Sequence, residues 1–424
     1  MRLRISQILL AGVLVCAPVM ASAAGFDPAA ATQAYLATLK GAARARSDAY
    51  FEGGYWLLLW NALAIITAHA VLLWTGLSAR FLEWAAHVTK RRGLQAVLWC
   101  VPYVATTTLL TLAWDSYADF FRERQYGLMN LSYGGWLGEY AIEACLSLLA
   151  FVLFVPLLMT VVRRSPRGWW LWGAGGASLI VAFFALIGPV FISPLFNTYT
   201  EMPKGPLRDR IVAMAASQHV PADHIYVFDQ SKQHDRVSAN VSGLGPTIRI
   251  SLNDNLLNRA TPAEVASVMG HELGHYVLGH VWWLIGQFTL VFVALFWVAS
   301  RVVPGLLSRY GQRWGVTEMD SAAAFPVYMI VLTVAFLVMT PITNSIIRNG
   351  ESEADAFGLD VAREPDGFAG AALKLAQYRK LEPGPVEEIL FYDHPSGATR
   401  IRMAMDWKAR HLADRPAGAP LPAR

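Results

Sequence analysis

Charged side chains are scarce in this sequence. Only 16% of its 424 residues are Asp, Glu, Lys or Arg, whereas 55% are hydrophobic and the mean hydropathy is +0.37. Soluble domains carry about 25% charged residues, so this composition excludes an ordinary soluble globular protein. The net charge of +4 is small for this length, and the basic residues lie beside apolar runs. Nothing in this pattern indicates a nucleic-acid partner.

Cysteine is also rare. Cys16, Cys100 and Cys145 all lie in apolar segments. Their spacing fits neither a disulfide framework nor a cysteine-based metal site, so we interpret them as core or lipid-facing residues.

Long apolar runs are what the sequence has in abundance, and several approach the ~20 residues that a helix needs to cross a bilayer. Arg2 and Arg4 precede the run Ile8 to Val19 and a small-residue site at Ala21-Ser22-Ala23, which is typical of a signal peptide or anchor over residues 1–24. We predict six further spans, at residues 56–78, 95–114, 141–162, 168–192, 281–302 and 322–343. The predicted organisation is a four-span N-terminal transmembrane domain (25–192), a second domain (193–412) with a transmembrane hairpin at 281–343, and a flexible tail (413–424).

The distribution of Lys and Arg between loops predicts the orientation. Basic residues concentrate in the loops after the first and third spans and inside the last hairpin: Arg80, Lys90, Arg91, Arg92, Arg163, Arg164, Arg167, Arg301, Arg309 and Arg313. The opposite loop, 115–140, has two Arg but four acidic residues. We therefore predict a multi-pass inner-membrane protein whose polar part, 195–280, and C-terminal part face the periplasm. A signal sequence requires the same arrangement.

The polar part has mixed secondary structure. Residues 225–228 and 247–252 have the apolar content of short strands, the second alternating Ile248, Ile250 and Leu252, and residues 206–218 have the pattern of an amphipathic helix. The fold class we expect is mainly α, with a small β-sheet in the polar part.

The strongest chemical signal is the motif His271-Glu272-Leu273-Gly274-His275. On a helix, residues four apart project from one face, so two imidazoles can bind one Zn²⁺ while the Glu reaches the metal-bound water. Thr261-Pro262-Ala263-Glu264 has the features of a helix N-terminus, with a cap, a first-turn proline and a capping-box Glu. We expect this helix to run through the motif without a proline break and into the span that starts near Val281.

A third ligand must come from elsewhere, because Leu278 and Val281 stand where a further Gly and His would extend the motif. After the last span, Asn344, Arg348, Glu351 and Asp355 fall on one helical face. We predict Glu351 as the ligand, with Glu353 as the alternative.

The hairpin supports this choice of ligand. The helix before its first span and the helix after its second emerge on the same side of the membrane. His275 and Glu351 would then stand roughly 9 and 12 Å above the bilayer core at the helical rise.

The ordered set of motifs resembles the type I CAAX prenyl endopeptidases over roughly residues 95–405. The resemblance rests on H-E-L-G-H followed by Gly279-His280, on Glu351 to Asp355, on His394-Pro395 ahead of Arg400-Ile401, and on Ser193-Pro194-Leu195-Phe196. It implies an α-helical transmembrane barrel around a chamber, with a gluzincin-type zinc protease domain, one Zn²⁺ per chain, and membrane-associated proteins or peptides as substrates.

The resemblance also implies roles for individual residues. Glu351 becomes the third zinc ligand, and Asp355 orients a ligating imidazole. His394 binds the oxyanion, and Arg348 and Arg400 stabilise nearby carboxylates, with Asn344 on the same face. The strand 247–252, with Ile248 and Ile250 after Asn240, becomes the edge that pairs with an extended substrate.

Two other functions stay open at this point. A protease with this chemistry could instead remove damaged membrane proteins with broad specificity. The isolated polar residues His69 and Glu143 lie within predicted spans, where ionisable groups are costly, and would fit a transporter or non-catalytic scaffold.

Overall fold

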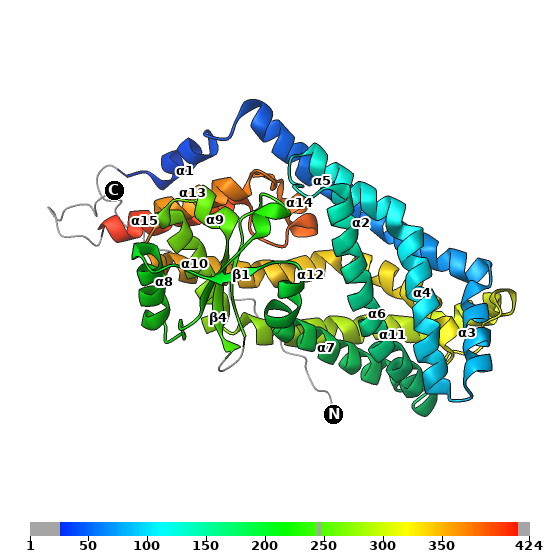
Figure 1. Ribbon diagram of the computed structural model, residues 1–424. Helices are drawn as coiled ribbons and strands as arrows, with labels where there is room; N and C mark the ends of the chain where they lie inside the picture. Colours follow the sequence, from blue (N-terminus) through cyan, green and yellow to red (C-terminus); the bar gives the residue numbers. More distant parts are fainter. Residues whose placement is uncertain (1–25, 244–246, 414–424) are drawn as a thin grey trace, which may run out of the picture.

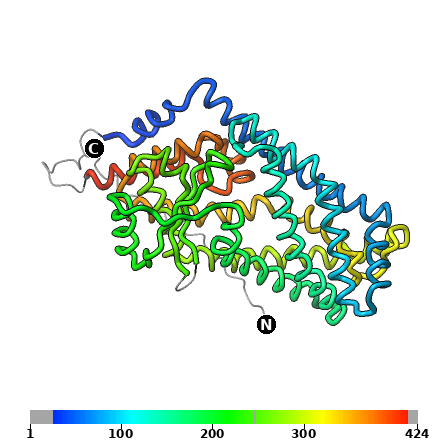
Figure 2. Tube along the Cα trace, viewed as in Figure 1, coloured from blue at the N-terminus to red at the C-terminus, as the bar shows by residue number. Residues whose placement is uncertain are grey.

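The computed structural model describes residues 26–243 and 247–413, and Figure 1 shows two regions. Long helices form a bundle on one side, and short helices with a small sheet form a compact region on the other. The helix α12 (Phe325–Ala362) extends from the bundle into the compact region, as the trace in Figure 2 also shows. The predicted signal segment 1–24 lies outside the described residues, as does the tail beyond Ala413.

Among the described residues, six helical segments are long and apolar enough to cross a membrane, in agreement with the six predicted spans. These segments are Gly41–Trp74, Arg92–Gln125, Tyr133–Arg164, Trp169–Leu195, His280–Trp314 and Ala322–Ala362. Their helices are α2 (Gly41–Trp74), α4 (Arg92–Asp115), α6 (Tyr133–Arg164), α7 (Trp169–Ile187), α11 (His280–Trp314) and α12. A π-helical turn, Ser116–Phe121, joins α4 to the short α5 (Arg122–Gln125), and a second, Gly188–Ile192, follows α7.

Large aromatic side chains fill the centre of the bundle. Trp99 and Tyr103 are stacked with ring centroids 4.4 Å apart, and Phe325 contacts both rings edge-on. The outer faces also carry apolar residues such as Leu109 and Leu179, which are exposed in the isolated chain. A helix that is apolar all round belongs in lipid, so these faces are the lipid-contacting surface.

The basic residues of the predicted cytoplasmic loops gather at the end of the bundle remote from the compact region. There the amphipathic helix α3 (Leu77–Val88) follows α2. The prediction that Arg301, Arg309 and Arg313 lie in a hairpin loop was wrong, because α11 continues to Trp314. Between α11 and α12 only residues 315–324 remain, and these include a 3₁₀ turn at Ala322–Ala324.

The compact region contains a four-stranded sheet within the described residues, in the order β1-β2-β4-β3. Its strands are β1 (Tyr199–Glu201), β2 (Ile225–Phe228), β3 (Ala239–Ser242) and β4 (Arg249–Asn253). The β2 and β4 strands are parallel, and the two outer pairs are antiparallel. The predicted strand 225–228 is confirmed, and the predicted strand 247–252 starts two residues later.

The expectation that the strand 247–252 lies at an edge of the sheet was wrong. Strand β4 is hydrogen-bonded on both sides, by β2 and β3, so it cannot accept another strand. Ile250 is fully buried in it, and Ile248 lies just before it and is also buried. Asn240 does lie at an edge, because β3 pairs with β4 alone.

The helix α10 (Pro262–Val277) carries the His-Glu motif and begins where the sequence predicts. The Thr261 side chain accepts a hydrogen bond from the Glu264 backbone N–H, and the Glu264 carboxylate accepts one from the Thr261 N–H. The buried face of α10, including Met269 and Leu273, packs with Ile250 of the sheet in one hydrophobic core. The short helices α8 (Pro206–Ser217) and α9 (Asp254–Arg259) flank this core.

The expectation of an unbroken helix from residue 261 into the membrane was wrong. Helix α10 ends at Val277, and α11 starts at His280. Gly279 lies between them with φ +68°, a left-handed conformation that glycine adopts without a steric penalty. The break changes the direction in which His280 projects.

Helices α10 and α12 cross at very short distance because glycines meet there. A Cβ added to Gly358 would lie 2.7 Å from the His271 backbone nitrogen, and one added to Gly270 would lie 2.8 Å from the Gly358 carbonyl oxygen. No larger residue fits at either position without moving a backbone. The crossing therefore fixes the first motif histidine against the helix that carries Glu351.

A third core covers the end of α12. It joins α1 (Pro28–Leu36), α13 (Pro365–Leu375) and α15 (Gly397–Ala413), with Leu36, Phe368 and Ile401 among its buried residues. The short helix α14 (Pro385–Phe391) lies between α13 and α15 in the chain and leads to His394.

A polar cluster joins the membrane bundle to the compact region. Arg236, three residues before β3, donates hydrogen bonds to the Glu123 carboxylate of α5 and to the Tyr50 hydroxyl of α2. Tyr50 also donates to Glu123 at 2.6 Å. The Glu123 side chain is only 12% exposed, so little solvent competes for this ion pair.

We predict that Gly358→Ala separates α10 from α12. Adding a side-chain atom to a tightly packed contact lowers the free energy of unfolding by about 1–3 kcal/mol. Here the displacement of the two helices also moves His271 away from Glu351. The expected result is a lower melting temperature together with reduced metal binding, measured by thermal unfolding and by metal analysis. Gly286→Ala is the control, because a Cβ added to Gly286 meets nothing within 4 Å; equal behaviour of the two variants would contradict the prediction.

Candidate metal centre

Two histidines of α10 and one carboxylate of α12 meet at a single point. The Nε2 atoms of His271 and His275 lie 3.0 Å apart, and Glu351 oxygens lie 3.3 Å and 3.4 Å from these two nitrogens. All three ligand atoms fall within 4.8 Å of one another. Tetrahedral ligands at zinc–nitrogen distances of about 2.0 Å are separated by roughly 3.3 Å, so the observed separations suit one Zn²⁺ ion.

The neighbours of His271 set its tautomer. Its Nδ1–H donates to Asp355 at 2.7 Å, and Asp355 is completely buried. Arg400 donates two hydrogen bonds to the same carboxylate, at 2.8 Å and 2.6 Å. A neutral imidazole that carries its proton on Nδ1 has a lone pair on Nε2, so Asp355 directs that lone pair into the site.

The residues present fit a metal ion. Two imidazole nitrogens face each other at 3.0 Å beside Glu351 Oε2, a buried oxygen that receives no hydrogen bond. Lone pairs directed at one another are unfavourable unless a cation lies between them. The donor set of two His and one Glu is that of the His₂Glu zinc peptidases.

The electrostatics of the site favour a positive charge. Burial alone would lower the pKa of His271, but the Asp355 and Glu351 carboxylates outweigh it and raise this pKa to about 10. The same negative charge attracts a cation in place of a proton. Burial also raises the pKa of Glu272, against the lowering effect of His271 and His275. A carboxyl with a raised pKa suits proton transfer.

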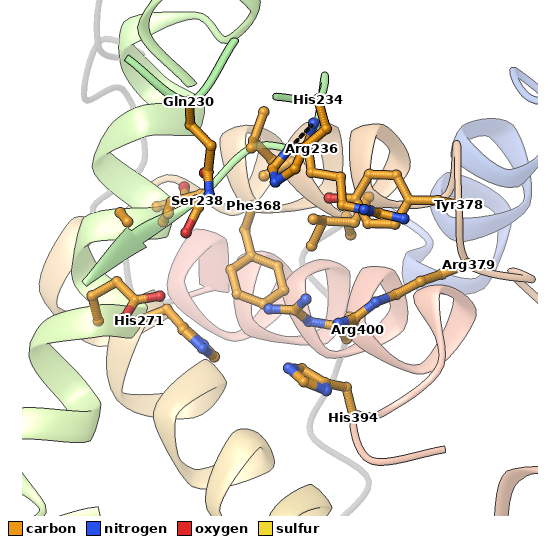
Figure 3. A pocket seen from close by; sticks show the side chains of 18 residues that line it. Gln230, His234, Arg236, Ser238, His271, Phe368, Tyr378, Arg379, His394 and Arg400 are labelled. Atoms are coloured by element: carbon orange, nitrogen blue, oxygen red, sulfur yellow. Dashed lines mark hydrogen bonds between the residues drawn. The ribbon is translucent and has the colours of Figure 1, made fainter. Parts of the chain in front are cut away.

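His394 approaches the same point from the opposite wall. Its Nδ1–H donates to Asp393 at 2.8 Å, and its Nε2 lies 3.2 Å from Glu351 Oε2. Figure 3 shows the His271 and His394 side chains pointing toward each other from different segments, with Arg400 and Phe368 beside them. His394, His271, Glu272 and Arg400 line one cavity of about 380 Å³.

Asn344 and Arg348 share the predicted helical face, but their contacts are not those expected. Arg348 donates to the Glu388 and Tyr392 carbonyls, and Asn344 donates to the Leu390 carbonyl at 2.9 Å. The prediction that Arg348 stabilises a carboxylate was therefore wrong. Both side chains hold the end of α14, two to six residues before His394. Arg400 does contact a carboxylate, that of Asp355.

Asn240 lies in a neighbouring cavity of about 470 Å³, which also contains Trp136, Glu139 and Glu143 of α6. This cavity shares Gln230, His234 and Ser238 with the one at the metal centre. The Asn240 Oδ1 atom is buried without a hydrogen-bond partner. Ile248 and Ile250, the other two residues of the expected substrate edge, belong to the packed core. The two cavities thus adjoin along the segment before β3.

Sequence reasoning missed one residue at this centre. His280 is 3% exposed and lies with its Nδ1 2.9 Å from His275 Nδ1, while its Nε2 is 3.2 Å from Glu353. Glu353, the alternative ligand, therefore contacts His280 instead of the two motif histidines. The Gly279 next to His280 was the available signal for the helix break that causes this contact.

The residues that suggested a transporter have local partners. His69 is buried with its two ring nitrogens next to the Ile65 carbonyl and the Tyr103 hydroxyl, at 2.6 Å and 2.8 Å. Glu143 lines the cavity that contains Asn240. His69 is therefore a core residue whose two ring nitrogens both have hydrogen-bond partners, and Glu143 is part of a polar cavity wall.

A bundle of membrane-spanning helices that carries a His-His-Glu centre beside a small sheet defines a membrane metallopeptidase. Comparisons with known proteins agree. The family model of the CAAX prenyl protease N-terminal region, described as five membrane helices, matches residues 34–198, and that of peptidase family M48 matches residues 201–408. The chain belongs to peptidase family M48 and is a membrane metalloendopeptidase.

The relatives and a solved structure cover much of the chain. It is 27% identical to the uncharacterized metalloprotease YhfN of Bacillus subtilis over 79% of either protein. It is 28% identical to a CAAX prenyl protease 1 homolog of Dictyostelium discoideum over 61% of either protein. The crystal structure of S. mikatae Ste24p has the same fold, with a TM-score of 0.70, 20% identity, and coverage of 89% of this chain and 94% of that one.

We predict that Glu351→Ala sharply reduces the metal content of the purified protein, because it removes one of three protein ligands. Wild type purified with zinc supplied should hold about one zinc per chain by atomic emission, as a single-ion centre requires. Glu318→Ala, a change at an exposed carboxylate in the α11–α12 connection, should retain the wild-type content. Full zinc content in Glu351→Ala would show that Glu351 is not a ligand.

Proposed function

We propose that this protein is a zinc endopeptidase that cleaves membrane-associated proteins or peptides within the cavity beside the metal centre. The convergence of His271, His275 and Glu351 carries this proposal, because the separations of their ligand atoms suit one zinc ion. Glu272 and His394 line the same cavity. A bound Zn²⁺ would polarise the scissile carbonyl and lower the pKa of water toward ~7.

In this mechanism Glu272 takes a proton from the attacking water and later passes it to the leaving amine. Its place on the cavity wall and its raised pKa support this exchange. Because Nδ1–H of His394 donates to Asp393, the Nε2 that faces the centre carries a proton only in the imidazolium form; in that form Nε2–H stabilises the oxyanion that develops on the substrate carbonyl. Asp355 and Arg400 keep His271 in the ligating tautomer. No covalent intermediate with the enzyme forms.

The substrate would bind as an extended strand along β3. Three features support this: β3 is an edge strand, its Asn240 has a buried oxygen without a partner, and the adjoining cavities lie beside it. Backbone hydrogen bonds to an edge strand recognise peptides largely independently of sequence. A defined processing role and broad removal of damaged membrane proteins both fit this binding mode, and cleavage-site mass spectrometry of wild-type and Glu272→Ala membranes distinguishes them.

We further propose that the protein resides in the inner membrane with its protease region in the periplasm. The regions would be the N-terminal membrane part to residue 192 and the protease part 193–412. The basic residues at the end of the bundle remote from the metal centre support this orientation under the positive-inside rule.

We predict that Glu272→Ala retains zinc but cleaves peptides at least about 100-fold more slowly, which is the usual contribution of general acid–base catalysis. The zinc content and the turnover of a fluorogenic peptide should be measured on the same preparation. Glu318→Ala should match wild type in both measurements. Turnover near the wild-type rate in Glu272→Ala would exclude the general-base role.

We predict that an alkaline phosphatase reporter fused after Ala413 is active in intact cells, because this enzyme folds only outside the cytoplasm. The same reporter fused in the α11–α12 connection, after Glu318, should be inactive. The reverse pattern would invert the proposed orientation and place the metal centre on the cytoplasmic side.

A further inference from the structure

His280 contacts a proposed zinc ligand on the side that faces away from the metal. Its Nδ1 lies 2.9 Å from His275 Nδ1, and its Nε2 lies 3.2 Å from Glu353 Oε2. The His280 ring is buried, while the Glu353 side chain is 69% exposed. The three side chains form a line from the metal centre to the surface.

This contact depends on the break between α10 and α11. In an unbroken helix a residue five positions after His275 would be rotated from it by roughly 140° and would point elsewhere. Gly279, with φ +68°, turns the chain so that His280 folds back toward His275. Gly350 of α12 lies against the His280 ring, where an added Cβ would make an ordinary contact at 3.7 Å.

Only one arrangement of protons suits the two neutral rings and the one carboxylate. A carboxylate accepts hydrogen bonds, so His280 must direct Nε2–H toward Glu353. The neutral His280 ring then has a lone pair on Nδ1, which accepts the Nδ1–H of His275. His275 in turn has its lone pair on Nε2, directed at the centre. Glu353 therefore sets the tautomer of a ring it does not touch.

We propose that His280 and Glu353 are positioning residues that hold His275 in its zinc-binding tautomer and orientation. This inference rests on the proposed zinc site. His280 and Glu353 serve His275 as Asp355 and Arg400 serve His271, so each imidazole of the centre has its own two-residue support. The supports differ, because the first ends at a buried ion pair and the second at an exposed carboxylate.

The test is the zinc affinity of the full-length protein in detergent, measured by competition with a chromophoric chelator. We expect His280→Phe to raise the dissociation constant for zinc about 10- to 100-fold, the usual effect of losing a hydrogen-bond partner of a metal ligand. His280→Asn should recover most of the affinity, because its Oδ1 can accept the His275 proton near the original Nδ1 position. His87→Phe, at the opposite end of the bundle, should match wild type.

Glu353 provides an independent measurement, because its exposed side chain can be removed without disturbing the core. Glu353→Ala should weaken zinc binding about 10-fold. The double variant His280→Phe/Glu353→Ala should bind no more weakly than His280→Phe alone, since Glu353 acts only through His280. A larger loss in the double variant would indicate direct ligation by Glu353 and overturn the inference.

Folding and function are separated by two further measurements. The melting temperature of each metal-free variant should equal that of the metal-free wild type. If His280→Phe melts lower, His280→Asn and Glu353→Ala decide the question. Wild-type affinity in Glu353→Ala and His280→Phe, with zinc lost in Glu351→Ala, refutes the positioning role and leaves the proposed function intact. Retention of zinc by Glu351→Ala shows that Glu351 is not a ligand and so refutes the proposed His-His-Glu zinc site.

Discussion

The close crossing of α10 and α12 is the constraint on which the metal centre depends. Gly270 and Gly358 allow two helix backbones to touch, and this contact places His271 beside Glu351 although 80 positions separate them in the sequence. The apolar hairpin of α11 and α12 brings the two residues to the same region, since it returns the chain to the side of the membrane from which it left. Helix packing within the compact region then sets the positions of the two side chains.

Around this crossing, buried polar side chains contact one another in a chain, and these contacts offset the free-energy cost of burying them. Arg400 binds Asp355, Asp355 binds His271, and His271 faces Glu351. A buried ion pair is stable when its remaining hydrogen bonds are satisfied, and Asp355 uses both of its oxygens. The exception is Glu351 Oε2, which is buried and accepts no hydrogen bond. An unsatisfied oxygen amid satisfied neighbours is what the proposed metal site requires.

Much of this arrangement follows from local sequence. The apolar runs predict the six spans, and the spacing of His271, Glu272 and His275 predicts one helical face, because hydrophobicity and helical periodicity are properties of short windows. The contacts of Arg348 and the edge position of β3 could not be predicted, since strand order and the approach of α14 depend on long-range packing. The break at Gly279 was predictable in principle, but a single glycine between two strongly helical segments is a weak signal.

The ion pair between Arg236 and Glu123 has a consequence for motion. It fastens the start of the edge strand β3 to helices of the membrane bundle, with Tyr50 as a third partner. Any movement that widens the space between bundle and sheet must therefore either carry β3 along or expose two charges that are now mutually neutralised. Widening this space to admit a polypeptide would thus be mechanically linked to the position of β3.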